Sequence, residues 1–238
     1  MNKMRLRILC TVLAGVLAAV PSLADTALVW SSGNPDGNTA GVAAYIAQYG
    51  CFSTVEAVDA DFVPLSTLVN YDVVLYFSNH SGSQDPVAIG DVLADYADTG
   101  RHLVIATFSW ANQGGNTLAG RVISDQISPL LPLGSSVYSS VTMSSHDGSG
   151  YFIAVNSVDG YYHDDVSLAA GAVLHASWSD GEPMLADKGN VVGIDLFPDD
   201  SFGLISGDYK KLFANAMCSP GATAVTATTW GSLKAHYR

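Results

Sequence analysis

Short apolar runs alternate with helical segments through the first half of the chain, and this alternation restricts the fold more than any other feature. The four runs with the character of buried strands are Thr26–Ser31, Ser53–Val58, Tyr71–Phe77 and Arg101–Phe108. Apolar residues at helical spacing begin after Thr39 and again after Asp85-Pro86, a capping residue followed by proline. This order predicts an α/β fold, a three-layer, doubly wound (flavodoxin-like) and mostly parallel sheet with helices on both faces.

The second half of the chain has a different pattern, in which strand-like segments are joined by short turns. These segments are Val137–Met143, Tyr151–Val155, Ala172–Trp178, Pro183–Ala186 and Val191–Phe197. We expect an antiparallel extension that returns to the main sheet at the last of them. A final helix from about Ser206 to Met217 completes the predicted fold.

The first 24 residues follow the order of a secretory signal peptide. Lys3, Arg5 and Arg7 form a basic start, and Ile8–Val20 is an apolar run followed by small residues up to Ala24. The alternative is a transmembrane anchor, but a run of about 13 apolar residues is short for a bilayer that needs about 20. We therefore expect cleavage after Ala24 and export, either to the periplasm or out of the cell.

The charge of the exported chain limits its partners. Cleavage removes three of the 10 basic side chains and none of the 22 acidic ones, so the net charge moves from −12 to −15. Such a surface repels phosphate backbones and anionic membranes, which argues against nucleic acid as a partner. With 48% hydrophobic residues the chain can form one core, and we expect a signal peptide over 1–24, one α/β domain over 25–218 and a tail over 219–238.

Cleavage also leaves two cysteines, Cys51 and Cys218, because Cys10 lies in the leader. In an oxidising compartment one bridge is favoured over two free thiols. The predicted fold gives a second reason. The first and last helices of a doubly wound sheet lie on the same face. Cys51 follows the end of the first helix and Cys218 ends the last one, so both cysteines lie at the same edge of the sheet.

Several segments resemble a known superfamily. Val191–Asp199 is similar to the strand-end segment of class I glutamine amidotransferases, where a glycine, an apolar residue, Gln, Phe, His, Pro and Glu follow in that order. The resemblance to the trehalose-utilisation-protein-like branch of this superfamily covers about residues 26–217 and implies the same α/β fold. The segments that carry it are Tyr71-Asp72-Val73-Val74-Leu75, Ser78-Asn79, Asp85-Pro86-Val87, Asp95-Tyr96 and Trp178-Ser179-Asp180-Gly181 with Pro183.

The catalytic residues of the family are not retained here. The family places a cysteine nucleophile at a strand-to-helix turn, and the corresponding turn, Thr107–Ala111, has Ser109 at that position. The family's catalytic histidine aligns with Phe197, and its orienting glutamate aligns with Asp199. A serine needs a base to accept its proton, and a phenyl ring cannot serve as one. The resemblance therefore implies a domain that has lost the chemistry of its family.

Three polar loops should meet where the parallel strands end, which is where open α/β sheets bind ligands. They are Ser32–Asn38, Ser78–Asp85 and Ser109–Asn116, and their neutral donors and acceptors suit a polar ligand such as a carbohydrate. The alternative is that these residues are ordinary loop formers. The candidate ligand-binding residues are Gly33, Asn34, Asn38, Asn79, His80, Ser81, Ser109, Trp110 and Asn112.

Two other functions remain open from the sequence. A carbohydrate-related hydrolase could use Ser109, His80 and Asp85 at the same edge, although Asp85 is also the expected helix cap. A structural envelope protein would need no pocket. No cofactor or metal is expected, since no histidine pair has metal-ligand spacing; if a cation binds, the first candidates are His163, Asp164 and Asp165.

Overall fold

The computed structural model describes residues 26–34, 37–49, 51–79, 85–112 and 116–219. The strands are β1 (Thr26–Ser32), β2 (Thr54–Asp59), β3 (Val73–Ser78), β4 (His102–Ala106), β5 (Leu130–His146), β6 (Val158–Leu168), β7 (Val173–Trp178), β8 (Pro183–Lys188), β9 (Val191–Ile194) and β10 (Ser206–Gly207). The helices are α1 (Thr39–Tyr49), α2 (Leu65–Leu68), α3 (Pro86–Asp98), α4 (Arg121–Ser124) and α5 (Tyr209–Cys218), with one 3₁₀ turn at Gly150–Phe152.

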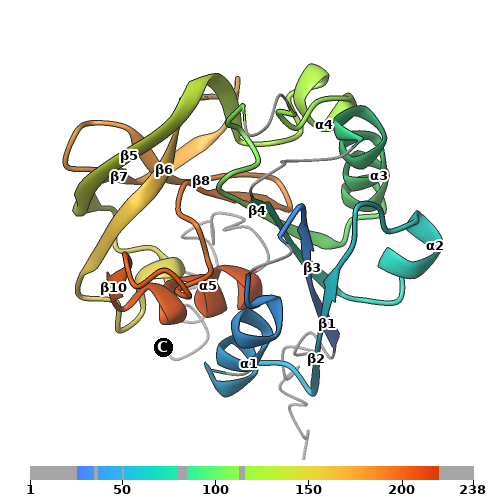
Figure 1. Ribbon diagram of the computed structural model, residues 1–238, viewed down its shortest axis with the longest axis horizontal. Coiled ribbons are helices and arrows are strands. Elements are labelled where there is room, and N and C mark those ends of the chain that lie inside the picture. Colours follow the sequence, from blue (N-terminus) through green and yellow to red (C-terminus); the bar gives the residue numbers. More distant parts are fainter. Residues whose placement is uncertain (1–25, 35–36, 50, 80–84, 113–115, 220–238) are drawn as a thin grey trace, which may run out of the picture.

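The strands form one 10-stranded sheet in the order β10-β6-β5-β7-β8-β9-β4-β3-β1-β2 (Figure 1). The block β9-β4-β3-β1-β2 is parallel. All other pairings are antiparallel. This confirms the predicted fold class, an α/β fold with a parallel core and an antiparallel extension.

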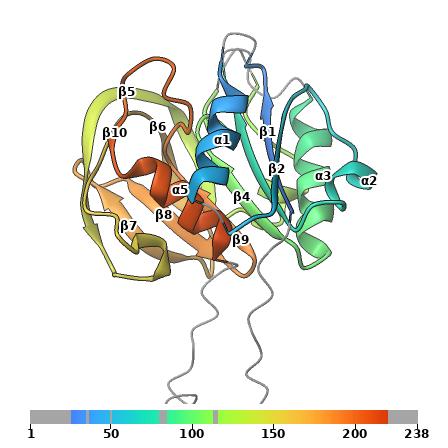
Figure 2. The same cartoon turned by 90° about the horizontal axis from the view of Figure 1, so that it is seen from below.

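Helices cover both faces of the parallel block, with α1 and α5 on one side and α3 on the other (Figure 2). Successive side chains of a strand point to opposite faces. In β3, Leu75 and Phe77 accordingly join the core beneath α1 and α5, whereas Val74 and Tyr76 join the core beneath α3. Every residue of β3 is buried, which explains its continuous apolar sequence.

The start of α3 follows from its sequence. The carboxylate of Asp85 accepts a hydrogen bond from the backbone N–H of Ala88 at 3.1 Å, and Pro86 occupies the first turn, where its missing N–H has no intrahelical partner to lose. The predicted cap is therefore confirmed, and it gives this carboxylate a local role.

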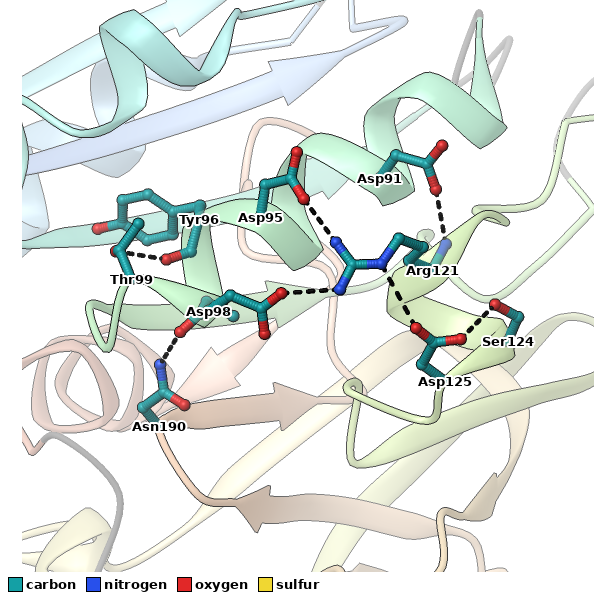
Figure 3. A network of polar contacts seen from close by, with 10 residues as sticks. Asp91, Asp95, Tyr96, Asp98, Thr99, Arg121, Ser124, Asp125 and Asn190 are labelled. Atoms are coloured by element: carbon teal, nitrogen blue, oxygen red, sulfur yellow. Dashed lines mark hydrogen bonds and ion pairs between the residues drawn. The ribbon is translucent and has the colours of Figure 1, made fainter.

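One arginine holds α4 against α3. The guanidinium of Arg121 pairs with Asp95 at 2.5 Å and with Asp98 at 2.7 Å on α3, and with Asp125 at 3.4 Å (Figure 3). The backbone N–H of Arg121 also donates to Asp91 at 2.8 Å. A helix this rich in aspartate needs a cation to reduce the repulsion along it.

Replacing Arg121 with glutamine should lower the melting temperature in low salt, because the aspartates of α3 would lose their shared counter-ion. The effect should shrink in 1 M NaCl, where ions screen the repulsion within about 3 Å. Arg101→Gln is the matched control, since that guanidinium contacts the Thr99 hydroxyl. Melting curves of the three proteins at both salt concentrations provide the measurement; an equal shift at both would contradict an electrostatic role.

The second half differs from the sequence prediction in two strands. The segment Tyr151–Val155 was predicted as a strand, but its first residues form the 3₁₀ turn, in which Tyr151 and Phe152 are buried. β5 pairs with β7 on one side and with β6 on the other, and the sequence pattern did not indicate β6. Its alternation is hidden because His163 and Asp164 occupy buried positions that an apolar pattern would require to be hydrophobic.

The antiparallel extension curls back onto the end of β9. The predicted strand Val191–Phe197 ends at Ile194, and the next residues lie beside β6. The N–H of Phe197 donates to the carbonyl of Tyr162 at 3.3 Å, and the N–H of Asp164 donates to Oδ1 of Asp195 at 2.7 Å. This contact places side chains of β6 at the carboxyl edge of the parallel sheet.

The predicted disulfide between Cys51 and Cys218 is confirmed, with the two Cα atoms 5.9 Å apart. It joins the segment after α1 to the last residue of α5. Among the helices of the described residues, none is long and apolar enough to cross a membrane.

Candidate functional site

The parallel strands end in polar side chains that the fold buries. Ser32, Ser78 and Thr107 stand at or just beyond the ends of β1, β3 and β4, and Asp195 follows β9; all four are completely buried. The sequence predicts a polar edge here, and the structure places these side chains beneath the surface.

The asparagines of the first two loops bond to each other. Nδ2 of Asn79 donates to Oδ1 of Asn34 at 2.9 Å, and Nδ2 of Asn34 donates to the hydroxyl of Thr39 at 3.3 Å. The structure therefore brings together two of the predicted ligand-binding residues, both of them buried. Gly33 adjoins Asn34 and has a positive φ of 59°. Asn38 is exposed and immediately precedes α1. Its side-chain oxygen accepts a hydrogen bond from the backbone N–H of Gly41. His80 and Ser81 lie outside the described residues.

The turn after β4 holds its side chains inward. The hydroxyl of Ser109, completely buried, donates to the carbonyl of Ala106 at 2.6 Å. Trp110 is also completely buried, and its indole N–H donates to the hydroxyl of Ser128 at 3.1 Å. Trp110 is a predicted ligand-binding residue, but its ring has no exposed surface to offer a ligand. Asn112, further along the same turn, is exposed.

Aromatic rings surround Phe197, the residue that the sequence resemblance aligns with the catalytic histidine of amidotransferases. Phe197 is 0% exposed and packs against Phe108 and Phe77, with ring centroids 5.1 and 5.7 Å away. Asp199, aligned with the orienting glutamate of the family, accepts hydrogen bonds from the backbone N–H groups of Asn38 and Ser201. It therefore organises loops.

Two buried carboxyl groups lie beside this aromatic packing, and no pattern in the sequence pairs them. The hydroxyl of Thr107 donates to Oδ1 of Asp195 at 2.8 Å, and the N–H of Trp110 donates to Oδ2 of Asp164 at 3.2 Å. The second oxygens, Oδ1 of Asp164 and Oδ2 of Asp195, are buried without a hydrogen-bond partner. No local signal identifies this pair, because it depends on the contact between residues 195–197 and β6.

Burial favours the neutral form of both acids. It raises the pKa of Asp164 to about 8, against the opposing effect of the N–H groups of Trp110 and Ala111 and the hydroxyl of Thr107. Burial first, and repulsion from Asp164 second, raise the pKa of Asp195 well above its ordinary value. Burial and mutual repulsion therefore make both groups harder to ionise than exposed aspartates.

The three residues predicted as candidates for cation binding each face different surroundings. His163 is buried with Nε2 2.9 Å from Oδ2 of Asp180, while Asp164 faces Trp110 and Asp165 is half-buried. In the part of the chain that the structure describes, no three His, Cys, Asp or Glu side chains are arranged to hold a metal ion.

Known proteins share this fold at low sequence identity. No protein-family model matches the sequence, and no curated protein matches it. A ThuA-like protein from Bacteroides uniformis is 12% identical with a TM-score of 0.57, covering 85% of this chain and 94% of that one. A GMP synthase-like protein from Thermoplasma acidophilum is 10% identical with a TM-score of 0.54. The match covers 87% of this chain and 97% of that one. A cytoplasmic protein from Salmonella typhimurium is 12% identical with a TM-score of 0.61, covering 80% and 98%.

These similarities establish the fold alone. The chain shares the α/β fold of these proteins, among them a ThuA-like and a GMP synthase-like protein. Function has to be argued from the site.

Proposed function

We propose that this protein is an exported, non-catalytic domain of the trehalose-utilisation-protein-like branch. It binds a polar ligand, with carbohydrate as the first class to test, or a protein partner near the carboxyl edge of its sheet. The observation that supports loss of catalysis is the packing at Phe197. A phenyl ring stands at the family's base position, and the Ser109 hydroxyl is buried and bonded to the Ala106 carbonyl. Acyl transfer needs a nucleophile with a base beside it, and this pair is missing.

Export is supported by two independent features. The basic and apolar leader has the order of a signal peptide, and the disulfide between Cys51 and Cys218 suits an oxidising compartment. Periplasmic fractionation of cells that express the full chain tests this part. Finding the chain in the cytoplasm with its leader uncleaved would contradict export.

Catalysis and binding can be tested on the mature chain. We expect no release of ammonia from glutamine above background, and the same background with Ser109→Ala. We also expect thermal-shift screening against neutral sugars to find a ligand that raises the melting temperature, since a ligand that binds the folded state stabilises it by mass action. Asn112→Ala, at an exposed position of the candidate edge, should reduce that shift, whereas Gln48→Ala on the exposed side of α1 should leave it unchanged.

The burial of Trp110 favours a second candidate, a structural envelope protein. With this ring in the core, the candidate edge has no open aromatic wall there. The thermal-shift screen distinguishes the two candidates, because a structural protein would show no stabilisation by any small polar ligand. Glutaminase activity that depends on Ser109 would contradict both.

A further inference from the structure

The longest strand of the sheet, β5, carries no charged side chain over most of its length. From Gly134 to Ser145, β5 contains six serines, Thr142 and Tyr138, and no acidic or basic residue. Elsewhere this chain is strongly acidic. β5 lies between β6 and β7 in the antiparallel extension (Figure 2). Its exposed hydroxyl residues are divided between the two faces of the strand and are Ser135, Ser139, Ser140, Thr142, Ser144 and Ser145. A stretch of about 12 residues in β-conformation extends about 40 Å.

Aromatic rings stand in the middle of this uncharged strand. Tyr138 is directly opposite Tyr162 of β6, with ring centroids 5.6 Å apart. Phe202, from the loop before α5, lies 6.3 Å from Tyr162. Tyr138 is 53% exposed and Phe202 is 42% exposed, although rings of this size are mostly covered in folded proteins. We call Tyr138, Tyr162 and Phe202 the aromatic strip.

The core holds the strip in place. Phe108, which is buried, contacts Tyr162 at 5.5 Å and Tyr138 at 6.1 Å between ring centroids. Rings fixed from below lose little conformational freedom when a ligand covers them, so their contact area is available for binding. An exposed aromatic group of this kind, surrounded by polar side chains, is typical of a binding surface.

The chemistry of this surface points to one class of ligand. Aromatic rings pack against the apolar C–H face of a pyranose, and serine and threonine hydroxyls exchange hydrogen bonds with its hydroxyl groups. No residue from Gly134 to Ser145 is charged, so this part of β5 has no side chain that would attract an ionic partner. The acidic remainder of the chain repels anionic polymers. Asp165, whose carboxylate lies beside Gly134, can accept hydrogen bonds from sugar hydroxyls at one end.

We propose that the aromatic strip and the uncharged length of β5 bind a neutral polysaccharide chain. This inference goes beyond the proposed function, because it places a second binding surface on β5, away from the edge loops that the proposed function uses. An extended strand of this length fits several linked sugar units better than a single one.

Cellohexaose and chitohexaose are suitable probes, titrated calorimetrically into the mature, oxidised protein. We expect one of them to bind, and Tyr138→Ala and Phe202→Ala each to weaken binding at least tenfold. Tyr49→Ala is the matched control, because Tyr49 is a 45% exposed ring on α1 outside the strip, and its binding constant should not change. Ser140→Glu adds a charge at an exposed position without removing any ring contact, and should also weaken binding.

The outcomes separate this inference from the proposed function. If neither hexasaccharide binds the wild-type chain, the inference is overturned, while the sugar screen with Asn112→Ala still decides the proposed function. If a hexasaccharide binds but Tyr138→Ala, Phe202→Ala and Ser140→Glu all retain wild-type affinity, the site lies elsewhere and the inference is again overturned. Binding lost equally in Tyr49→Ala would indicate a general effect of truncation and would also reject the strip.

Discussion

Replacing Asp164 with asparagine should stabilise the protein at pH 8 and weaken the dependence of its stability on pH. In the folded chain this carboxyl group is completely buried, and its Oδ1 has no hydrogen-bond partner. An amide keeps an oxygen to accept the N–H of Trp110 and removes the repulsion toward Asp195. An unpaired buried group costs about 1–3 kcal/mol and more when it is charged, and the amide stays neutral at pH 8, so we expect a gain of about 2 kcal/mol.

The sign of the pH effect follows from the raised pKa values. Because the pKa values of Asp164 and Asp195 are higher in the folded state than in the unfolded state, the folded chain holds more protons. The stability that this contributes is complete below about pH 4, the unfolded pKa, and is lost as the pH rises toward 8. The wild-type chain should therefore unfold more easily at pH 8 than at pH 5.

Other groups near the pair titrate as well, so a matched comparison is needed. Glu182, whose charge acts on Asp195, also has a raised pKa, with burial as the main cause. Asp165→Asn is the control, because Asp165 is the next residue of β6 and is half-buried. Urea unfolding at pH 5, 7 and 8 should give a flatter profile for Asp164→Asn than for the control or the wild type. Equal slopes in all three proteins would show that the pair carries no excess proton.

The parallel half of this fold was predictable because its signals are local. β3 is an unbroken apolar run, and α3 begins with Asp85 and Pro86, so periodicity and capping identify both without tertiary information. The strand β6 carries no such signal. Its buried His163 and Asp164 are polar, and their burial depends on partners such as Asp180 and Trp110 that are distant in sequence.

The positions of the strand ends were predictable, but the burial of the side chains beside them was not. Strand order places the ends of β1, β3, β4 and β9 at one edge, as the sequence indicated. Whether a side chain there faces solvent depends on packing from the second half of the chain. Ser128 and β6 close over Trp110, and Asp195 meets Asp164, because the extension curls back onto β9. Neither contact follows from local sequence.

Removing the disulfide should cause the largest single loss of stability. Cys51 and Cys218 are 167 residues apart in sequence, so the bond closes nearly the whole described chain into a loop. A bridge over a loop of this length restricts the unfolded state by about 5 kcal/mol in the chain-entropy model. We expect the double variant Cys51→Ser, Cys218→Ser to lose about that much free energy of unfolding in urea.

Besides this global loss, local opening of the folded chain should increase most at the end of α5, where the bond attaches. Without it, the last turn of α5 is held by packing and by His102, whose Nε2 lies 2.7 Å from the carbonyl oxygen of Ala216. Amide hydrogen exchange in the final turn should therefore accelerate more than exchange in α3, which lies on the opposite face and shares no contact with the bridge. Reductant should lower the stability of the wild-type chain to that of the double variant and leave the variant unchanged. A difference below about 1 kcal/mol between oxidised and reduced wild type would mean that core packing, and not the covalent link, holds α5 against the sheet.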